Sequence, residues 1–288
     1  MRVLVTGGAG LVGSHACEIL LNRGAQVFCI DNLLLGTLKH IESYSSNTDF
    51  EFEKWDVSTP RWYQSLKNRK PFDLFLHLAS NSDISLGHQN PSLEFERTFQ
   101  TTFECLKACK ELRIQNFIFS SSSAVYGAHP TLPTPESASQ MYPISHYGAA
   151  KLASEAVISS FVENYGLDAW IFRFGNVVGQ RLTHGVVFDF IRKLLHNQSE
   201  LVVLGNGKQT KTYIHVEDCV KGILHAFEKS PAEKNHSKKF QVFNLSTQGT
   251  TSVQEIAEKT VALIATPQTK ILYGTSPAGW VGDVPFTH

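Results

Sequence analysis

Three glycines spaced three residues apart, directly after a short apolar run, constrain the fold of this chain most strongly. The run at 3–5 (Val-Leu-Val) predicts a buried strand, and Gly7, Gly10 and Gly13 follow where the apolar spacing changes to that of a helix. The first glycine permits a tight turn, the second lets the backbone approach a pyrophosphate, and the third lets the helix pack against the strand. Backbone N–H groups at the helix start, near Leu11 and Val12, are then free to hold phosphate oxygens.

An acidic residue in register with this turn extends the pattern to a dinucleotide site. A second apolar run, 26–30, ends at Asp31, eighteen residues after Gly13, where a carboxylate accepts from adenosine ribose hydroxyls. A lone glycine triad is also consistent with a simple turn, but strand, triad, helix, strand and acid together favour the nucleotide. Asp31 repels a 2′-phosphate, and the first basic residue downstream is Lys39, so the sequence predicts NAD rather than NADP.

Composition limits the class of protein. The 288 residues carry 26 basic and 26 acidic side chains, and this zero net charge argues against general binding of nucleic acid or an anionic membrane. A strand that begins near residue 3 leaves no room for a signal peptide, and no apolar run approaches the length of a membrane span. The five cysteines form no CxxC pair, and Cys105 and Cys109 have no acidic or histidine partner at matching spacing. We therefore expect a cytoplasmic protein with reduced thiols and no metal site.

Strands and helices alternate along the first half of the chain. Strands are predicted near 2–6, 26–31, 50–54, 73–78 and 116–121, and helices near 11–23, 92–112 and 147–165. This order predicts an α/β fold, a Rossmann-type doubly wound parallel sheet with a smaller C-terminal α/β substrate-binding domain. We expect the NAD-binding domain at 1–176, completed by parts of 210–230, and the smaller domain at 177–288.

Two of the predicted helices carry apolar stripes. Residues Phe95, Phe99, Phe103 and Leu106 form one, and Ala150, Ala153, Val157 and Phe161 form the other. The simplest interpretation is that both stripes contact the core. Alternatively, the two helices pair across a two-fold axis and form a homodimer through a four-helix bundle.

A tyrosine and a lysine one helical turn apart indicate acid–base chemistry. Tyr147 and Lys151 lie on one helix face, and Ser122 stands at the end of a hydroxyl-rich strand. Free tyrosine is a poor base at neutral pH, with a pKa of about 10. A lysine ammonium and the positive nicotinamide ring would lower that pKa. Alone, the Tyr–Lys pair is typical of an ordinary amphipathic helix; beside a dinucleotide turn it favours catalysis.

The ordered motifs of the chain resemble those of an extended short-chain dehydrogenase/reductase of the nucleotide-sugar epimerase/dehydratase group. They lie at 6–13, 31–32, 56–57, 77–79, 121–127, 143–151, 173–179, 213–218 and 282–285. The resemblance implies that Tyr147 is the base, that Lys151 holds the nicotinamide ribose and lowers the tyrosine pKa, and that Ser122 assists at the sugar oxygen. It implies further cofactor contacts from Asn32, Asp56, Val57, Leu78, Ala79 and Ser120, and substrate contacts from Asn176 and Lys211.

The resemblance also bears on the reaction. Members that eliminate water carry Asp-Glu where this chain has Ser123 and Ala124, and Ala124 cannot protonate a leaving hydroxyl. This favours 4-epimerisation of a UDP-hexose through a transient 4-keto sugar, with no net use of NAD. Another nucleotide-sugar oxidoreductase, decarboxylase or dehydratase, and a non-catalytic NAD-binding sensor or scaffold, remain alternatives.

Several positions depart from the group's pattern. Thr98 stands where an asparagine is usual, and Lys211 replaces an arginine that grips the diphosphate, so the bidentate fork is lost. The segment 278–280 (Ala-Gly-Trp) supplies no arginine for the second phosphate. The chain stops at His288, where other members continue into a helix, so we expect the smaller domain to be either short or truncated.

Overall fold

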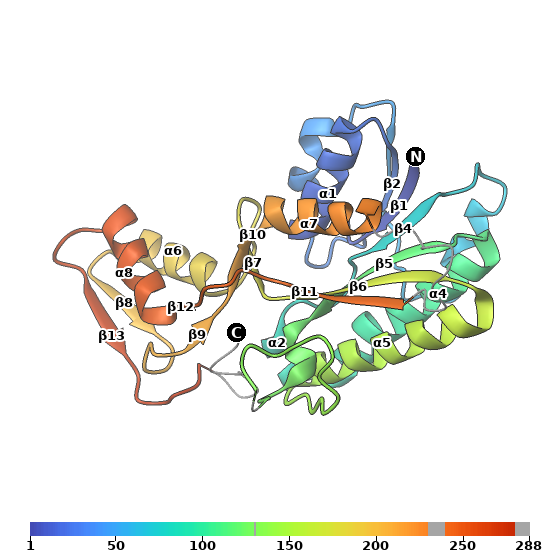
Figure 1. Ribbon diagram of the computed structural model, residues 1–288. Coiled ribbons are helices and arrows are strands. Elements are labelled where there is room, and N and C mark those ends of the chain that lie inside the picture. Colours follow the sequence, from blue (N-terminus) through green and yellow to red (C-terminus); the bar gives the residue numbers. More distant parts are fainter. Residues whose placement is uncertain (130, 230–239, 280–288) are drawn as a thin grey trace.

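The computed structural model describes residues 1–129, 131–229 and 240–279, and it places a large sheet beside a smaller lobe (Figure 1). All seven strands of the sheet are parallel, in the order β11-β6-β5-β4-β1-β2-β3. They are β1 (Arg2–Thr6), β2 (Gln26–Ile30), β3 (Phe50–Glu53), β4 (Leu74–His77), β5 (Asn116–Ser122), β6 (Asp168–Phe174) and β11 (Phe240–Leu245). The strand order reverses between β1 and β4. Ligands of such sheets bind beyond the carboxyl ends of the strands at this reversal.

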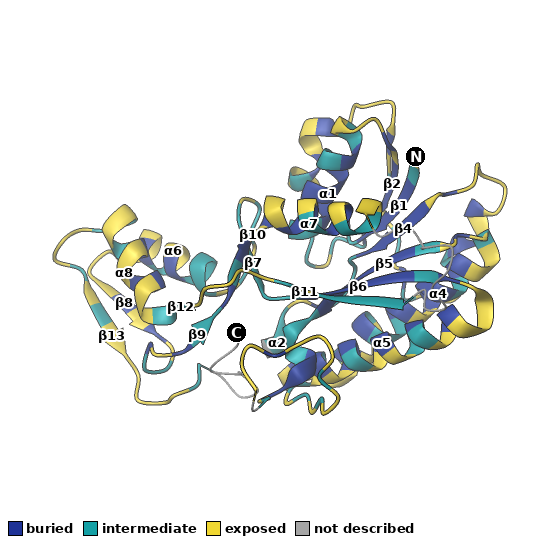
Figure 2. Cartoon of the chain, in the orientation of Figure 1, coloured by how far each residue is buried: buried dark blue, intermediate teal, exposed yellow. Residues whose placement is uncertain are grey.

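Helices cover both faces of the sheet. The strand β1 shows why: Val3 and Val5 pack into one apolar cluster with α1 (Leu11–Asn22) and α7 (Val216–Lys229). Leu4, between them, points to a second cluster with α4 (Thr101–Leu112) and α5 (His146–Tyr165). Alternate side chains of a strand point to opposite faces, so an unbroken apolar run needs both faces covered. Figure 2 shows the strands as the buried centre of this arrangement.

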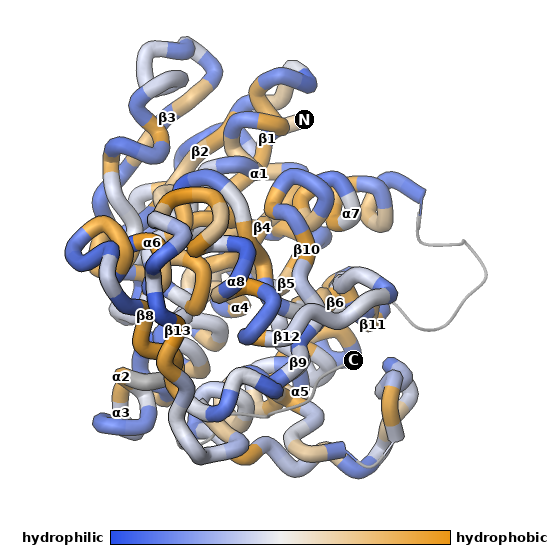
Figure 3. The backbone as a smooth tube through the Cα atoms, turned by 90° about the vertical axis from the view of Figure 1, so that its left-hand side faces the viewer, coloured by the Kyte–Doolittle hydropathy of each residue, from blue (hydrophilic) through white to orange (hydrophobic). Residues whose placement is uncertain are grey.

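The smaller lobe has an apolar cluster of its own. Helices α6 (Val186–His196) and α8 (Val253–Ile264) pack on the parallel pair β8 (Glu200–Val203) and β13 (Lys270–Tyr273). The hydrophobic stretches of these two strands lie side by side in Figure 3. Short pairs connect the lobe to the sheet: β7 (Asn176–Val178) with β10 (Tyr213–His215), and β9 (Thr210–Lys211) with β12 (Thr251–Ser252). Two shorter α-helices are α2 (Ile84–Gln89) and α3 (Ser92–Glu94), and the described residues also contain short 3₁₀ helices at Leu38–His40, Glu42–Tyr44, Trp62–Leu66 and Ser123–Tyr126.

The predicted α/β architecture and its first five strands are confirmed, whereas the division at residue 176 needs a correction. Strand β11 pairs with β6 in the main sheet, although the sequence assigned residues 240–245 to the smaller domain. The chain therefore leaves the large domain and returns to it. No helix among the described residues is long and apolar enough to cross a membrane.

The chain is helical over the predicted range 92–112, but the helix is not regular. A π-helical turn, Phe95–Gln100, separates α3 from α4. A wider turn shifts the angular position of later side chains, so the predicted stripe does not stay on one face. Leu106 is buried, but Phe95 is 60% exposed and Phe103 is 38% exposed. The stripe on α5 divides in the same way, because Ala150 and Phe161 are buried while Ala153 is exposed.

Candidate active site

The turn after β1 has the close backbone packing that its glycines predict. Gly7 has φ +73°, and a Cβ there would lie 2.6 Å from the backbone nitrogen of Ala79. A Cβ on Gly13 would overlap the carbonyl oxygen of Gly7. Helix α1 starts at Leu11, after Gly10, and no side chain of the described residues caps it. Its first N–H groups have no partner within the helix, so they can bind an anion.

Asp31 ends β2 beside this turn and binds the backbone on both sides. Its Oδ2 accepts from the N–H of Ala9 at 3.0 Å, and its Oδ1 accepts from that of Leu33 at 2.8 Å. Burial raises the pKa of Asp31, while these two hydrogen bonds lower it. A carboxylate oxygen can accept more than one hydrogen bond, so Asp31 can hold the turn and still accept from a ribose hydroxyl.

The predicted adenine-binding residues lie together beyond β2 and β3. The Nδ2 of Asn32 donates to Oδ2 of Asp56 at 3.3 Å, and Ser58 donates its N–H and hydroxyl to Oδ1. Burial raises the pKa of Asp56, but the hydrogen bonds from Ser58 and Asn32 outweigh it and lower the pKa. Val57 is buried beside them. The arrangement gives one polar and one apolar wall, which suits a purine.

Leu78 and Ala79 follow β4, directly opposite the glycine turn. The N–H of Leu78 donates to the carbonyl oxygen of Thr6 at 3.0 Å, and the backbone of Ala79 lies against Gly7. His77, one residue earlier, is fully buried; its ring nitrogens contact the hydroxyls of Thr6 and Thr102 at 2.7 and 3.2 Å. Burial lowers the pKa of His77 to about 3, so this imidazole is neutral and fixes the strand end.

Ser122 and Tyr147 meet because the start of α5 packs closely on the end of β5. Helix α5 begins after Ser145, whose hydroxyl oxygen accepts from the N–H of Gly148 at 3.0 Å. A Cβ on Gly148 would lie 2.5 Å from the carbonyl oxygen of Ala124, so glycine is needed for this approach. The Ser122 hydroxyl is hydrogen-bonded to the phenol of Tyr147. The predicted serine and tyrosine therefore share one hydrogen bond.

Lys151 lies one turn further along α5 and is almost completely buried. Its Nζ donates to the carbonyl oxygen of Ser120 at 2.6 Å and lies 4.7 Å from the ring centre of Phe119. Burial lowers the pKa of Lys151 to about 7, opposed by the carboxylates of Glu94 and Glu155. The hydroxyl of Ser120 donates to the carbonyl of His77 at 3.4 Å, so β4, β5 and α5 are linked at this point.

The pKa of Tyr147 departs from the sequence prediction. Burial raises it above its ordinary value, the carboxylate of Glu94 raises it further, and the hydrogen bond with Ser122 lowers it. The sequence predicted the opposite direction because it placed a lysine ammonium and the positive nicotinamide ring beside the phenol. The Lys151 ammonium instead points at the Ser120 carbonyl, and its nitrogen is 5.7 Å from the centre of the Tyr147 ring.

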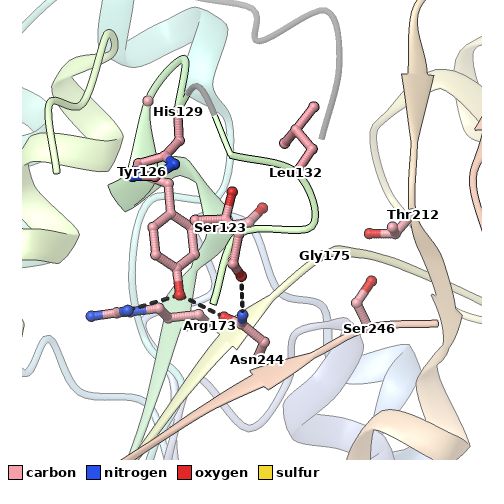
Figure 4. Close-up of a pocket in the computed structure, with 11 residues that line it drawn as sticks. Ser123, Tyr126, His129, Leu132, Arg173, Gly175, Thr212, Asn244 and Ser246 are labelled. Atoms are coloured by element: carbon pink, nitrogen blue, oxygen red, sulfur yellow. Dashed lines mark hydrogen bonds between the residues drawn. The ribbon is translucent and has the colours of Figure 1, made fainter. Parts of the chain in front are cut away.

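A cavity of about 60 Å³ opens next to Ser122 and is shown in Figure 4. Its lining includes the hydroxyl and amide side chains of Ser123, Tyr126, Thr212, Asn244 and Ser246, together with Gly175 and Arg173. The Tyr126 hydroxyl donates to Oδ1 of Asn244 at 2.8 Å and accepts from Nη1 of Arg173 at 2.8 Å. These bonds join the ends of β5, β6 and β11 under the cavity floor.

The predicted substrate contacts come from the strands that lead into the smaller lobe. Asn176 begins β7, and its Nδ2 donates to the carbonyl oxygen of Thr212 at 3.2 Å. Lys211 precedes Thr212 on β9 and pairs in register with Thr251 of β12. Both side chains are half-buried. The predicted phosphate segment 282–285 and Trp280 lie outside the described residues.

Sequence reasoning missed three buried charged groups of the site. Glu155 forms a bidentate pair with Arg173, and the charge of Glu94 raises the pKa of both Tyr147 and Lys151. The sequence does not distinguish a buried charged residue from an exposed one. Of the three, only Arg173 could have been recognised, because it lies in the motif 173–179. No group of three or more His, Cys, Asp or Glu in the described segments is arranged to hold a metal.

The model of the NAD dependent epimerase/dehydratase family matches residues 3–245. The chain belongs to this family. The UDP-glucose 4-epimerase of Mycolicibacterium smegmatis is 29% identical over 272 residues, which cover 93% of this chain and 84% of that protein. The human dTDP-D-glucose 4,6-dehydratase is 28% identical over 274 residues, with 91% and 74% covered.

Solved structures of the family superpose along the whole chain. A UDP-glucose 4-epimerase from Thermotoga maritima, solved with UDP-glucose, has a TM-score of 0.87 at 27% identity, with 100% of this chain and 89% of that chain covered. A UDP-galactose 4-epimerase has a TM-score of 0.85 at 32% identity, with 100% and 88% covered. The predicted family and Rossmann-type fold are thus confirmed.

NAD is the cofactor of this family, and the residues at its expected place fit it. A diphosphate needs a close backbone approach and free N–H groups, which the turn 7–13 provides. The acid at Asp31 and the side chains of Asn32, Asp56 and Val57 continue along the same edge. Lys151 and Tyr147 stand at the other end of that edge, beyond β4 and β5.

Proposed function

We propose that this family member is a nucleotide-sugar epimerase that inverts C4 of a UDP-hexose. The observation that carries the proposal is the cluster of Ser122, Tyr147 and Lys151 on the edge of the sheet that also holds the glycine turn. An oxidation of a sugar hydroxyl needs an acceptor for a proton next to an acceptor for a hydride. The UDP-sugar epimerases among the relatives support the choice of substrate.

Each of the three side chains has a role that follows from its position. Bound NAD would supply the acceptor for a hydride from C4 of the sugar and the donor for its return. Tyr147 takes the proton of the 4-hydroxyl and gives it back after the 4-ketone has turned in the site. Ser122, hydrogen-bonded to the same phenol, holds the sugar oxygen in line. With NAD in place, the ammonium of Lys151 would orient the nicotinamide ribose, and the positive nicotinamide ring would offset the burial and the Glu94 charge that raise the pKa of Tyr147.

The residue after Ser123 argues against dehydration. One relative is a 4,6-dehydratase, so the family includes both reactions. Elimination of water from C5 and C6 needs an acid and a base near the cavity beside Ser122. Ala124 offers a methyl group, and its N–H is used by the hydroxyl oxygen of Ser122 at 3.2 Å. Epimerisation needs no further acid there.

The test is conversion of UDP-glucose to UDP-galactose by the purified protein with no added cofactor. Tyr147→Phe keeps the ring and removes the acid–base oxygen, so its rate should fall by about 100-fold or more. Tyr142→Phe is the matched control, since Tyr142 is 73% exposed, and it should keep the parent rate. Stoichiometric use of NADH would indicate a reductase instead. Retained NAD without conversion of any UDP-, GDP-, CDP- or dTDP-sugar would favour the sensor or scaffold.

We further propose that two copies associate as a homodimer through a four-helix bundle. Exposed Phe95 lines a groove of about 340 Å³ between α3, the π-helical turn and α5, and Phe103 of α4 is exposed as well. An exposed apolar patch of this kind is typical of a protein interface. Light scattering should give twice the chain mass of 32.0 kDa, and Phe95→Glu should give a monomer. Leu195→Glu, at an exposed leucine of the smaller lobe, should leave the dimer intact.

The place of the protein in the cell is also a proposal. All five cysteines are free and buried in this structure. Free thiols are typical of a reducing compartment, which supports the cytoplasm.

A further inference from the structure

A buried carboxylate lines the same groove as the first turns of α5, the helix that carries Tyr147. Glu94, the last residue of α3, is 1% exposed. Its Oε1 accepts from Nδ2 of Asn81 at 2.6 Å, and its Oε2 accepts from the hydroxyl of Thr98 at 2.9 Å. Both donors are neutral, so these bonds solvate the carboxylate without cancelling its charge. Buried carboxylates are rare unless they are paired, and a function is the usual reason to keep one.

Three neighbours, Asn81, Thr98 and Gly87, accommodate the Glu94 side chain. Thr98 sits one turn after Glu94 and also accepts from the N–H of Asn81 at 3.3 Å. This gives a physical reason for a threonine where asparagine is usual in the family, because the hydroxyl donates to Glu94. A Cβ on Gly87 of α2 would overlap the carboxylate, so α2 leaves space for it. The position is therefore built for an acid.

The charge of Glu94 acts on both catalytic groups of α5. It opposes loss of the proton from Tyr147 and favours the protonated form of Lys151, and it also faces His146 at the start of the helix. Burial raises the pKa of Glu94 itself, while the bonds from Asn81 and Thr98 lower it. The other carboxylate beside Lys151 is Glu155, which is paired with Arg173. His88, on α2, is exposed.

We propose that Glu94 is a positioning residue of the Tyr147–Lys151 pair: its buried carboxylate keeps the lysine charged and makes the phenolate of Tyr147 a stronger base. The proposal deepens the epimerase function and rests on it. A phenol that is harder to ionise is a stronger base once it has lost its proton. Without Glu94, the lysine amine would lose its proton at a lower pH, and the phenol would ionise at a lower pH too.

Glu94→Gln tests this directly, since the amide keeps the shape and removes the charge. The ultraviolet absorbance of tyrosinate is titrated in the parent and in E94Q, and each is compared with the same protein carrying Tyr147→Phe. The chain has eight tyrosines, and the difference isolates the titration of Tyr147 from that of the other seven. The midpoint of Tyr147 should fall by roughly one pH unit in E94Q, because the negative charge that opposes ionisation of the phenol is removed.

Two controls separate charge from structure. Glu96→Gln removes an exposed carboxylate from the next turn and should leave the midpoint where it is. Glu94→Asp keeps the charge, so its Tyr147 midpoint should stay within a few tenths of a pH unit of the parent. This variant also provides a test if E94Q folds poorly. An E94Q midpoint equal to that of the parent, or an equal shift in E96Q, overturns the proposal.

The pH dependence of turnover gives a second readout. If the epimerase function holds, both limbs of the profile of E94Q should move to lower pH, because the proton affinities of Tyr147 and Lys151 change in the same direction. A uniform loss of rate with an unmoved profile would mean a merely structural role and would overturn the proposal. The tyrosinate titration needs no substrate, so it reports on Glu94 even if no sugar nucleotide is converted.

Discussion

The buried pair of Glu155 and Arg173 gives a sharp prediction for stability. The two side chains are 5% and 4% exposed, and the guanidinium donates through Nε at 3.0 Å and through Nη2 at 2.6 Å to the two carboxylate oxygens. The hydroxyl of Ser121 donates to the same carboxylate at 2.5 Å. A bidentate pair with such a third bond is fully satisfied, so its desolvation is compensated only while both partners are present.

Glu155→Leu removes one partner and leaves the other charge in the interior. The guanidinium then keeps the Tyr126 hydroxyl at 2.8 Å and the Glu136 carbonyl at 3.2 Å, neither of which carries a negative charge. Loss of one member of a buried pair costs about 3–5 kcal/mol of unfolding free energy. A domain of ordinary stability has about 5–15 kcal/mol in total, so the variant should unfold at a much lower urea concentration.

Equilibrium unfolding in urea, followed by circular dichroism, measures this cost. Glu163→Leu, at an exposed glutamate of the same helix, is the matched control and should change the free energy by less than about 0.5 kcal/mol. The double variant Glu155→Leu/Arg173→Met removes both charges and should recover most of the loss. The reasoning is refuted if E155L costs no more than E163L, or if the double variant is less stable than E155L.

Two further predictions concern the cofactor and the pH. Gly13→Ala should weaken NAD binding by at least about tenfold in calorimetry, because its Cβ overlaps the Gly7 carbonyl, whereas Gly249→Ala, with nothing within 4 Å, should bind as the parent does. Burial lowers the pKa of His77 from 6.5 to about 3, so its neutral form stabilises the fold above pH 6.5. That contribution, roughly 5 kcal/mol at most, is lost as the pH falls from 6.5 towards 3. In urea titrations His77→Gln should show a smaller loss over this interval; an equal slope contradicts the assignment.

The sequence predicted the first half of the fold because its local signals agree with each other. An apolar run, three glycines and a helical period describe β1, the turn and α1 without reference to distant residues. Strand β11 could not be placed this way, because its membership of the main sheet depends on β6, some seventy residues earlier. Pairing partners that far apart leave no trace in either segment alone.

The helix at 92–112 shows a different limit. Its apolar spacing is helical throughout, but the π-helical turn adds a residue to one turn and rotates the side chains of α4 relative to those of α3. Thr98, buried inside that turn, was visible as a departure from the family pattern. The structure gives the departure a reason, since its hydroxyl donates to Glu94. A departure from the family pattern at a buried polar position thus indicates a second change nearby.

The charges around Lys151 show how the limits of sequence-based prediction affect the active site. A lysine buried without acidic neighbours loses several units of pKa, and at neutral pH it would carry no charge. The charge of Glu155 is largely balanced by Arg173, with which it shares two short contacts, whereas the partners of Glu94 are an amide and a hydroxyl. The carboxylate with neutral partners is therefore the one that can keep Lys151 protonated. The sequence contains both glutamates, but only the π-helical turn and the glycine at 87 decide which of them faces the lysine with its charge intact.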